Sequence, residues 1–277
     1  MKTLRVVGPG RAGRSLAAAL SSAGWRALAA IGRDAPERDL AAAGEGVDLL
    51  VIATPDDVIA DVASRIDPVD STVIAHLSGS QTLDVLAPHG RRASIHPLVS
   101  LPDAEAGAAR LRGAWFAIAG DPLAADVVAD LEGRALFVDD GDRAGYHAAA
   151  VVASNHLVAL LGQVERLAAT AGVPLAAYLD LVRATVDNVE RLGTQGALTG
   201  PVARGDWSTL ARHLAAIDPS ERAAYVALAE AAARLANRSL PPIPPPPPRP
   251  LAANIRIRTF AAKEPVGGAA VGGLEGS

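Results

Sequence analysis

The sequence predicts an α/β fold, a doubly wound parallel sheet at the N-terminus, followed by an all-α helical domain. Three observations support this prediction: short apolar runs alternate with helix-like segments to about residue 138, strand signals then disappear, and a glycine-rich turn follows the first apolar run. The chain has 277 residues, half of them hydrophobic, which is enough for two domains with buried cores. We expect residues 1–142 and 143–239 to form these two domains.

Seven apolar runs in the first domain have the composition of strands that are buried on both faces. Val, Ile, Leu and Ala dominate them without strict alternation of apolar and polar residues. The runs are Leu4–Val7, Ala27–Ile31, Leu49–Ala53, Thr72–Ala75, Ala93–Ile95, Ala114–Ala119 and Ala135–Val138. Between them, residues 11–23, 57–65 and 122–132 are expected to form amphipathic helices. This order is typical of a parallel sheet that is covered by helices.

The second domain is predicted to contain four helices. Its pattern is helical to about Asn237, with breaks at residues 172–174, 193–205 and 218–219. Prolines then dominate the chain from Pro241 to Pro250; they cannot donate backbone hydrogen bonds and favour extended geometry. We therefore expect residues 240–277 to be a disordered Pro/Gly-rich tail, either a plain linker or a segment that docks on a partner.

Composition argues against several classes of function. A net charge of -4 provides no basic field for a phosphate backbone, so nucleic acid is not an expected partner. The absence of cysteine excludes disulfides, thiol nucleophiles, iron–sulfur clusters and Cys-ligated zinc. The two lysines, Lys2 and Lys263, lie near the two ends, which argues against Schiff-base catalysis and a phosphate-loop NTPase. Redox chemistry would therefore need a bound cofactor.

The chain is expected to be cytoplasmic, because its first segment runs directly into a strand pattern without the features of a signal peptide. Residues 144–164 contain no Asp, Glu, Lys or Arg and are long enough to cross a bilayer. They also contain His147, Ser154, Asn155 and His156, which would be costly in lipid. We therefore expect a buried helix of a soluble domain, and no membrane partner.

The glycine-rich turn is the strongest functional signal. It consists of Gly8, Pro9, Gly10, Arg11, Ala12 and Gly13. In a Rossmann-like dinucleotide site the first glycine permits a tight turn, the second lets the backbone approach the pyrophosphate, and the third lets helix and strand pack closely. The helix N-terminus adds free N–H groups and the positive end of its dipole. The alternative is a glycine turn that binds no ligand.

The residues after the second strand should decide between the two nicotinamide cofactors. An acidic residue there would bind the ribose 2′-hydroxyl and repel a 2′-phosphate. Arg33 stands about where that acid should be and could pair with the phosphate, whereas Asp34 could serve the hydroxyl if the strand ends one residue later. We expect NADP to be preferred, with NAD possible.

Polar residues follow the third, fourth and fifth strands, where ligands bind in open α/β sheets. Thr54 and Pro55 are expected on the ribose and diphosphate side of the cofactor. Ser78, Ser80 and His96 are expected to face the nicotinamide, although the serines could instead serve only the turn. His96 is the candidate general acid, because an imidazole near its ordinary pKa of ~6.5 can deliver a proton at neutral pH. The alternative is a structural histidine ordered by the following proline.

Two further candidates come from the helical domain. Asn155 continues a polar stripe that begins at His147, and it could meet the nicotinamide or bond to neighbouring helices. Arg204 lies in the conspicuous segment 199–206, where its guanidinium could clamp a substrate carboxylate or form a structural salt bridge. We expect His96 as the acid, Asn155 and Ser78 as positioning groups, and Arg204 as the clamp.

Several motifs together resemble a known family, uncharacterised bacterial proteins that join a Rossmann-like domain to a C-terminal domain of unknown function 2520. The shared motifs are the glycine turn and residues 54–57, 76–80, 94–98, 146–155 and 199–206. That family in turn resembles pyrroline-5-carboxylate reductases and prephenate dehydrogenases. The resemblance implies a nicotinamide cofactor, cofactor and substrate roles for Ser78 or Ser80, a catalytic role for His96, and a homodimer through the helical domain. The lysine that hydroxyacid dehydrogenases place before their asparagine would fall on Val151, so their lysine chemistry is in doubt.

These features predict an NADP-preferring oxidoreductase that transfers a hydride between nicotinamide and a carbonyl or imine carbon of a small, carboxylated substrate. The competing hypothesis is a non-catalytic NAD(P)-binding sensor or scaffold whose proline-rich tail recruits a partner. A purely structural dimer is a third reading, and it predicts no cofactor binding.

Overall fold

The computed structural model describes residues 1–239 and 241, so nearly all of the predicted tail at 240–277 lies outside the described residues. The chain separates into two compact units, Met1–Gly162 and a second unit that begins at Gln163. The first unit contains helix α6 (Arg143–Val151), which the sequence assigned to the helical domain. The reason is that Tyr146 of this helix is hydrogen-bonded to the sheet through His96.

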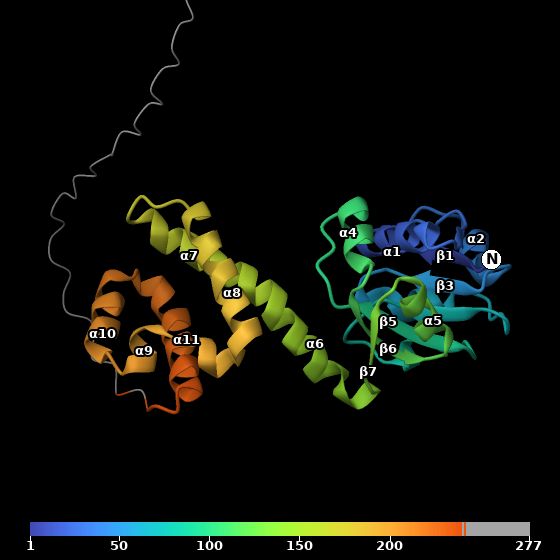
Figure 1. The fold of residues 1–277 in the computed structure, drawn as a ribbon. Coiled ribbons are helices and arrows are strands. Elements are labelled where there is room, and N and C mark those ends of the chain that lie inside the picture. Colours follow the sequence, from blue (N-terminus) through green and yellow to red (C-terminus); the bar gives the residue numbers. More distant parts are fainter. Residues whose placement is uncertain (240, 242–277) are drawn as a thin grey trace, which may run out of the picture. The chain divides into compact units, whose positions relative to one another are not determined.

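A seven-stranded sheet forms the centre of the first unit (Figure 1). Its strands are β1 (Thr3–Val7), β2 (Arg26–Ala27), β3 (Leu49–Ile52), β4 (Val73–His76), β5 (Arg92–Pro97), β6 (Trp115–Gly120) and β7 (Arg134–Phe137). They lie in the order β2-β1-β3-β4-β5-β6-β7. The predicted α/β fold with seven strands is confirmed, and the strand order places the carboxyl ends of β1, β3, β4 and β5 side by side.

The predicted parallel sheet has one antiparallel pair, because β6 runs opposite to β5. The connection between these strands carries the chain to helix α1 and back, with Ser15 bonded to the Asp103 carbonyl at 3.1 Å. It returns to the end at which β5 stops, where the Leu98 N–H donates to the Trp115 carbonyl at 2.8 Å. The chain therefore enters β6 from that end and runs in the opposite direction.

Helices cover both faces of the sheet. They are α1 (Arg11–Ser22), α2 (Glu37–Ala41), α3 (Ile59–Ser64), α4 (Ala104–Leu111) and α5 (Leu123–Asp130). One buried cluster joins the sheet to α1, α4 and α5 through residues such as Leu16, Leu111 and Val127, and a second joins it to α2 and α3 through Leu40 and Ile59. These two apolar layers hold the sheet in place and explain why its central strands are buried on both sides.

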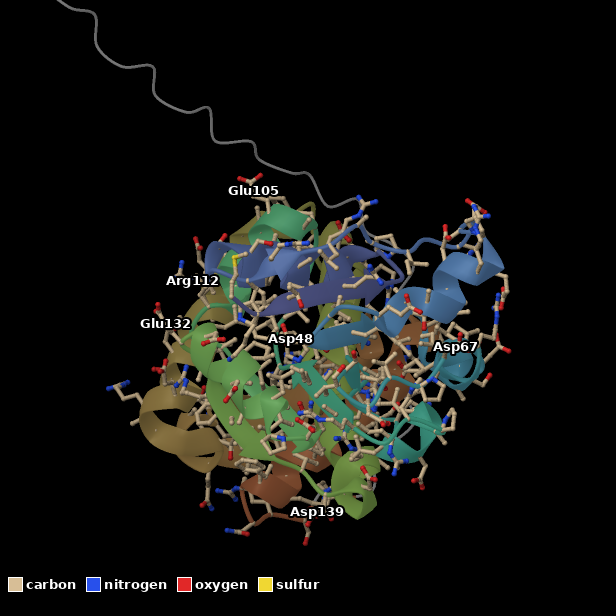
Figure 2. All side chains as sticks on the ribbon, turned by 90° about the vertical axis from the view of Figure 1, so that its right-hand side faces the viewer. Asp48, Asp67, Glu105, Arg112, Glu132 and Asp139 are labelled. Atoms are coloured by element: carbon tan, nitrogen blue, oxygen red, sulfur yellow. The ribbon has the colours of Figure 1, made fainter. Side chains whose placement is uncertain are left out.

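Polar contacts tie together the segments in which several strands begin. The Asp48 carboxylate accepts hydrogen bonds from the Thr3 backbone N–H (2.7 Å) and hydroxyl (2.9 Å), which tie the start of β1 to the start of β3 (Figure 2). These hydrogen bonds lower the pKa of Asp48. Arg112 donates to Glu132 at 3.0 Å on the surface, near the turn that leads into β7 (Figure 2). Contacts of this kind help to hold neighbouring strands in place.

The helical part begins with an uninterrupted helical stretch in which α6 is followed by a π-helical segment, Val152–His156, and α7 (Leu157–Ala169). The remaining helices are α8 (Ala176–Ala197), α9 (Gly200–Arg204), α10 (Trp207–Ala216) and α11 (Arg222–Leu235). The predicted breaks fall where helices end; Gly193, with φ of 71°, interrupts α8, and the short α9 lies inside the predicted break 193–205. Leu210, Leu214 and Ala229 form a small core in the second unit.

The helical stretch Asp140–Ala169 is long and apolar enough to cross a membrane by length and composition, with a mean hydropathy of 1.3 in its most apolar window. Only 6% of that window is buried, whereas the sequence predicted a buried helix. The difference arises because the stretch contacts the sheet only through α6, around Tyr146 and His147, whereas Val152 of the π-helical segment and Val158 of α7 are exposed.

Candidate functional site

The glycine turn lies between β1 and α1 and requires glycine at two positions for steric reasons. Gly8 has φ of 86°, and a Cβ there would lie 2.9 Å from Thr54 Cγ2. A Cβ on Gly13 would lie 2.7 Å from Val6 Cγ1. Gly10 differs, because a Cβ there would meet no atom within 4 Å. The turn is therefore closed toward the sheet and open in front of Gly10, where a ligand could approach the backbone.

The N-terminus of α1 faces this opening. Gly10 is its N-cap, with no side-chain hydrogen bond, and the first helical bond runs from the Arg14 N–H to the Gly10 carbonyl at 3.0 Å. The N–H groups of Arg11, Ala12 and Gly13 therefore have no acceptor within the helix, and together with the helix dipole they favour an anion.

A cavity of about 460 Å³ joins this helix N-terminus to the carboxyl ends of the central strands. It is lined by Gly10, Arg11, Ala12, Ala53, Thr54, Pro55, Leu77, His96, Pro97, Val99 and Leu101. The Thr54 hydroxyl is buried and has no hydrogen-bond partner among the described residues. A buried hydroxyl of this kind is satisfied when a polar ligand binds, so the cavity fits a group that carries phosphate and ribose oxygens.

Arg33 and Asp34 lie beside the turn and are both exposed. The predicted second strand is shorter than expected: β2 has two residues, and the chain rejoins the sheet only at Ile31. There the Ile31 carbonyl accepts a hydrogen bond from the Gly8 N–H at 2.9 Å, and Arg33 follows Ile31 by two residues. Arg33 has no ion-pair partner in the part of the chain that the structure describes.

Ser78 and Ser80 are engaged in a turn after β4. Both hydroxyls donate to Asp56 Oδ2, at 2.7 Å from Ser78 and 2.8 Å from Ser80. Ser78 Oγ also accepts the backbone N–H groups of Ser80 (3.2 Å) and Gln81 (3.1 Å). Its donor and acceptor capacity is therefore used within the turn. Neither serine is among the residues that line the cavity.

His96 is the titratable group that lines the cavity opposite the helix N-terminus. It belongs to β5 itself, where it pairs with Ala117 of β6, so the strand runs further than predicted. Its Nδ1 is hydrogen-bonded to the Tyr146 hydroxyl at 2.7 Å. The Tyr146 ring meets the imidazole edge to face, with centroids 5.5 Å apart, and the His147 ring does so at 5.9 Å.

Gly79 permits this approach of β5 and α6. A Cβ at Gly79 would lie 2.7 Å from His147 Cδ2 and 2.9 Å from both Cε1 and Nε2 of His96. The serine-rich turn therefore contributes its glycine to the site more directly than its hydroxyls. Glycine here also avoids a clash with the second ring nitrogen of His96.

The electrostatic environment keeps His96 neutral. Burial, and then the charges of His147 and Arg143, lower the pKa of His96 to about 4, against a smaller opposing effect of Asp56. The expectation of an imidazole near its ordinary pKa is therefore wrong. His76, fully buried at the end of β4, has its pKa lowered to about 4 by burial and by Arg143. Burial raises the pKa of Tyr146, and the Arg143 charge opposes that rise.

Arg143 is the residue that sequence reasoning missed. Its side chain is 1% exposed, and its Nε donates to Asp140 at 3.0 Å. Both terminal nitrogens, Nη1 and Nη2, are buried and have no hydrogen-bond partner among the described residues. The signal was the spacing of Arg143, Tyr146 and His147, which places three polar side chains on one turn of α6.

Asn155 and Arg204 occupy other parts of the molecule. Asn155 lies in the π-helical segment, where its Oδ1 accepts a hydrogen bond from Ser154 at 2.9 Å and its side chain is exposed. Arg204 is the last residue of α9, in the second unit, and is exposed. π-Helical segments occur frequently at functional sites, so Asn155 keeps a structural argument in its favour.

The comparisons with known proteins agree with this architecture. Residues 115–232 match a family model described as domain of unknown function (DUF2520). No curated protein matches the sequence. Among solved structures, the chain is similar to BF3122 from Bacteroides fragilis, provisionally described as an NADP oxidoreductase, with a TM-score of 0.69 and 19% identity over 84% of this chain and 98% of that one.

Two more solved structures have the same fold. Protein TM1727 from Thermotoga maritima has a TM-score of 0.65 and 23% identity, over 84% of this chain and 98% of its own. The pyrroline carboxylate reductase of Plasmodium falciparum, solved with NADP bound, has a TM-score of 0.53 and 11% identity, over 85% of this chain and 100% of its own. The resemblance found in the sequence motifs is confirmed: this chain joins a Rossmann-like domain to a region, residues 115–232, that matches the DUF2520 family.

Proposed function

We propose that the protein is an NADP-preferring oxidoreductase that transfers a hydride between nicotinamide and a carbonyl or imine carbon of a small, carboxylated substrate. The observation that carries this proposal is one cavity that joins the open glycine turn to a half-buried, neutral histidine. A dinucleotide site alone would not need His96 at the far wall of that cavity. The BF3122 and pyrroline carboxylate reductase folds support the same reaction class by analogy.

The residues around the cavity fit such a cofactor. The free N–H groups of Arg11, Ala12 and Gly13 would hold the diphosphate, and the unpaired Thr54 hydroxyl would bind an adjacent oxygen. Arg33 would pair with the 2′-phosphate, since its guanidinium is free for a bidentate contact. When bound, the cofactor supplies the hydride, and the protein supplies binding and orientation.

The side chains around the reacting carbon would act on the substrate oxygen or nitrogen. His96, whose Nδ1 is occupied by Tyr146, would present Nε2 to that atom. We retain Asn155 as a positioning group and Arg204 as the carboxylate clamp, and we assign Ser78 a positioning role through the turn that carries Gly79. Leu77, Val99 and Leu101 would limit water in the cavity, which strengthens polar contacts there.

Cofactor preference tests the first half of the proposal. Thermal unfolding with millimolar NADP+ or NAD+ should show a larger stabilisation by NADP+, because a ligand that binds only the folded state raises the melting temperature. Arg33→Ala should weaken NADPH binding far more than NADH binding. Equal losses for both cofactors would remove Arg33 from the site, and no stabilisation by either would refute the proposal.

The chemistry is tested with NADPH that carries deuterium at C4. Small 2-oxo acids and cyclic imino acids form the substrate panel, and mass spectrometry detects deuterium in the reduced product. Transfer to a member of the panel is the expected result. Cofactor binding with no transfer to any carbonyl or imine compound would favour the sensor hypothesis over an enzyme.

We also propose a soluble, cytoplasmic homodimer that uses the helical region. Support comes from exposed apolar side chains on the helices: Val158 is 70% exposed and Val152 57% in the first unit, and Leu181 is 63% exposed in the second. Surfaces of this kind commonly mark interfaces. Light scattering coupled to size exclusion should give twice the chain mass without detergent, and Val158→Asp should lower it. A monomer in wild type would contradict the dimer, and a need for detergent would indicate a membrane.

A further inference from the structure

We infer that Tyr146 is the proton source behind His96: the phenol donates to Nδ1, neutral His96 gives its Nε2 proton to the substrate, and the buried Arg143 guanidinium stabilises the phenolate that remains. The inference rests on the proposed function, because it names the groups that complete hydride transfer at the same site.

The geometry sets the order of the relay. His96 lines the cavity, and Tyr146 lies behind it on α6, with its hydroxyl 2.7 Å from Nδ1. The second ring nitrogen, Nε2, lies beside Gly79, where a Cβ would come within 2.9 Å of it, so only glycine avoids a clash with this nitrogen. Nδ1 of the imidazole is thus bonded to the phenol, whereas Nε2 has no hydrogen-bond partner among the described residues and is the nitrogen left for a substrate. A two-step proton transfer needs one nitrogen for each of these roles.

Arg143 supplies a positive charge, and two of its three guanidinium nitrogens have no hydrogen-bond partner among the described residues. It precedes Tyr146 by one turn of α6, its side chain is 1% exposed, and only Nε is bonded, to Asp140. Nη1 and Nη2 are buried without partners among the described residues. Buried guanidinium groups are normally satisfied by acceptors, because an unpaired buried donor is costly. A phenolate at Tyr146 would add a second negative charge near this guanidinium, beside that of Asp140.

The charges around His96 favour this route over an imidazolium. His147, His76, Arg143, Tyr146 and Asp56 surround the ring, and Asp56 alone is acidic. Burial and the first three of these groups disfavour a positive imidazole, while Arg143 favours a negative phenol oxygen. Proton transfer from Tyr146 to Nδ1, together with loss of the Nε2 proton, leaves His96 neutral throughout.

The bonds and electrons balance. When the hydride reaches a carbonyl carbon, a C–H bond forms and the π electrons of C=O move to oxygen. The Nε2–H bond of His96 breaks as the new O–H bond forms. The O–H bond of Tyr146 breaks as Nδ1–H forms, which leaves the phenolate beside Arg143. A proton from water then restores the phenol, so the sum is hydride plus one solvent proton added to the carbonyl.

The position of the resting proton on His96 is the first test. Full-length protein with 15N-labelled histidine is titrated by NMR from pH 8 to 5.5, and His96→Gln identifies the His96 signals. A neutral ring with the proton on Nε2 throughout is expected. Tyr146→Phe should abolish the single tautomer, and Tyr225→Phe, which removes a phenol from the other His–Tyr pair, should leave the His96 signals unchanged. A wild-type ring with its proton on Nδ1, or an unchanged tautomer in Tyr146→Phe, would overturn the relay.

The role of Arg143 is tested by phenol ionisation at 295 nm, with Tyr146→Phe used to identify the Tyr146 component. Arg143→Gln should raise the pKa of Tyr146 by on the order of one pH unit, or tenfold in phenolate, and Arg143→Lys should reverse most of this change. No difference between wild type and Arg143→Gln would remove Arg143 from the relay. If Arg143→Gln does not fold, Arg143→Lys decides. A Tyr146 pKa equal to that of wild type in this variant supports a role for the positive charge at position 143, and a raised Tyr146 pKa argues against that role. The stabilisation of the wild-type protein by NADP+ is measured in parallel. If NADP+ does not stabilise the protein, the proposed function is refuted, but the NMR result on the His96 tautomer remains valid.

Discussion

Two His–Tyr pairs in this protein share one geometry and differ in everything around it. His96 is bonded to Tyr146 and His213 to Tyr225, each at 2.7 Å, and both pairs of rings meet edge to face at 89° and 86°. The first pair contacts a cavity and lies near a buried arginine, whereas His213 is exposed on α10. Burial raises the pKa of both tyrosines, but only at Tyr146 does an arginine oppose it. A hydrogen-bonded pair thus becomes a candidate site through its surroundings.

The largest expected difference between the pairs is in hydride transfer. His96→Gln should lower the rate of deuterium transfer from labelled NADPH by roughly 100-fold or more, because the group that protonates the product is lost. NADP+ stabilisation should remain. The matched variant His213→Gln should keep the wild-type rate. Undiminished transfer in His96→Gln, or equal losses in both variants, would end the distinction between the two pairs.

Stability in acid should depend on the buried histidine next to the first pair. His76 has a folded-state pKa of about 4, below its unfolded value. Its contribution to the free energy of unfolding is therefore fully present above pH 6.5 and is lost as the pH falls toward 4. The loss amounts to about 3 kcal/mol, from about 1.4 kcal/mol for each pH unit. Urea unfolding at pH 7 and pH 4.5 should show a smaller pH dependence in His76→Leu than in wild type. The same dependence in both proteins would show that His76 is not the group concerned.

Close packing distinguishes the first pair in a further way. Gly79→Ala would place a Cβ within 3 Å of both His96 and His147, and overpacking of this kind costs about 1–3 kcal/mol. The His96 NMR signals should move as well. Gly90→Ala is the control, since a Cβ at Gly90 would meet no atom within 4 Å. If the two variants have equal unfolding free energies, β5 and α6 are not packed as closely as described.

The smallest effect is expected at the second pair. Tyr225→Phe removes the hydrogen bond to His213 and should cost about 1 kcal/mol or less in unfolding free energy, because the histidine can bond to water instead. NADP+ binding and deuterium transfer should be unaffected. A loss of transfer comparable to that of His96→Gln would assign the second pair a part in the reaction.

Strand positions could be predicted closely from the sequence, because buried runs such as Leu49–Ile52 are apolar on both faces. Strand direction could not, since the composition of Trp115–Gly120 is the same whether the strand is parallel or antiparallel. Helix α4 was missed because Gly107 weakens its signal; that glycine is needed where α4 touches Ser15 of α1.

The site was predictable only where local sequence carries it. The glycine turn and His96 follow from strand ends, but Tyr146 acts on a residue 50 positions away, and no local pattern shows that pairing. Arg143 was missed for the same reason, because its burial depends on how α6 packs. Ser78 was ambiguous for a different reason, because a serine at the end of a strand can either contact a ligand or stabilise a turn. Its hydrogen bonds to Asp56, Ser80 and Gln81 favour the turn.

The π-helical segment Val152–His156 changes how positions along this helix can be compared with those in other proteins. Its hydrogen bonds span five residues instead of four, so each side chain beyond it is turned relative to a regular α-helical wheel. A residue two regular turns after His147 therefore does not point in the direction that a helical wheel predicts. In a regular α-helix, a lysine four residues before an asparagine points to the same side as the asparagine. An alignment that places this pair on Val151 and Asn155 therefore equates side chains that face different directions. Removal of one residue from the π-helical segment would rotate α7 with respect to α6.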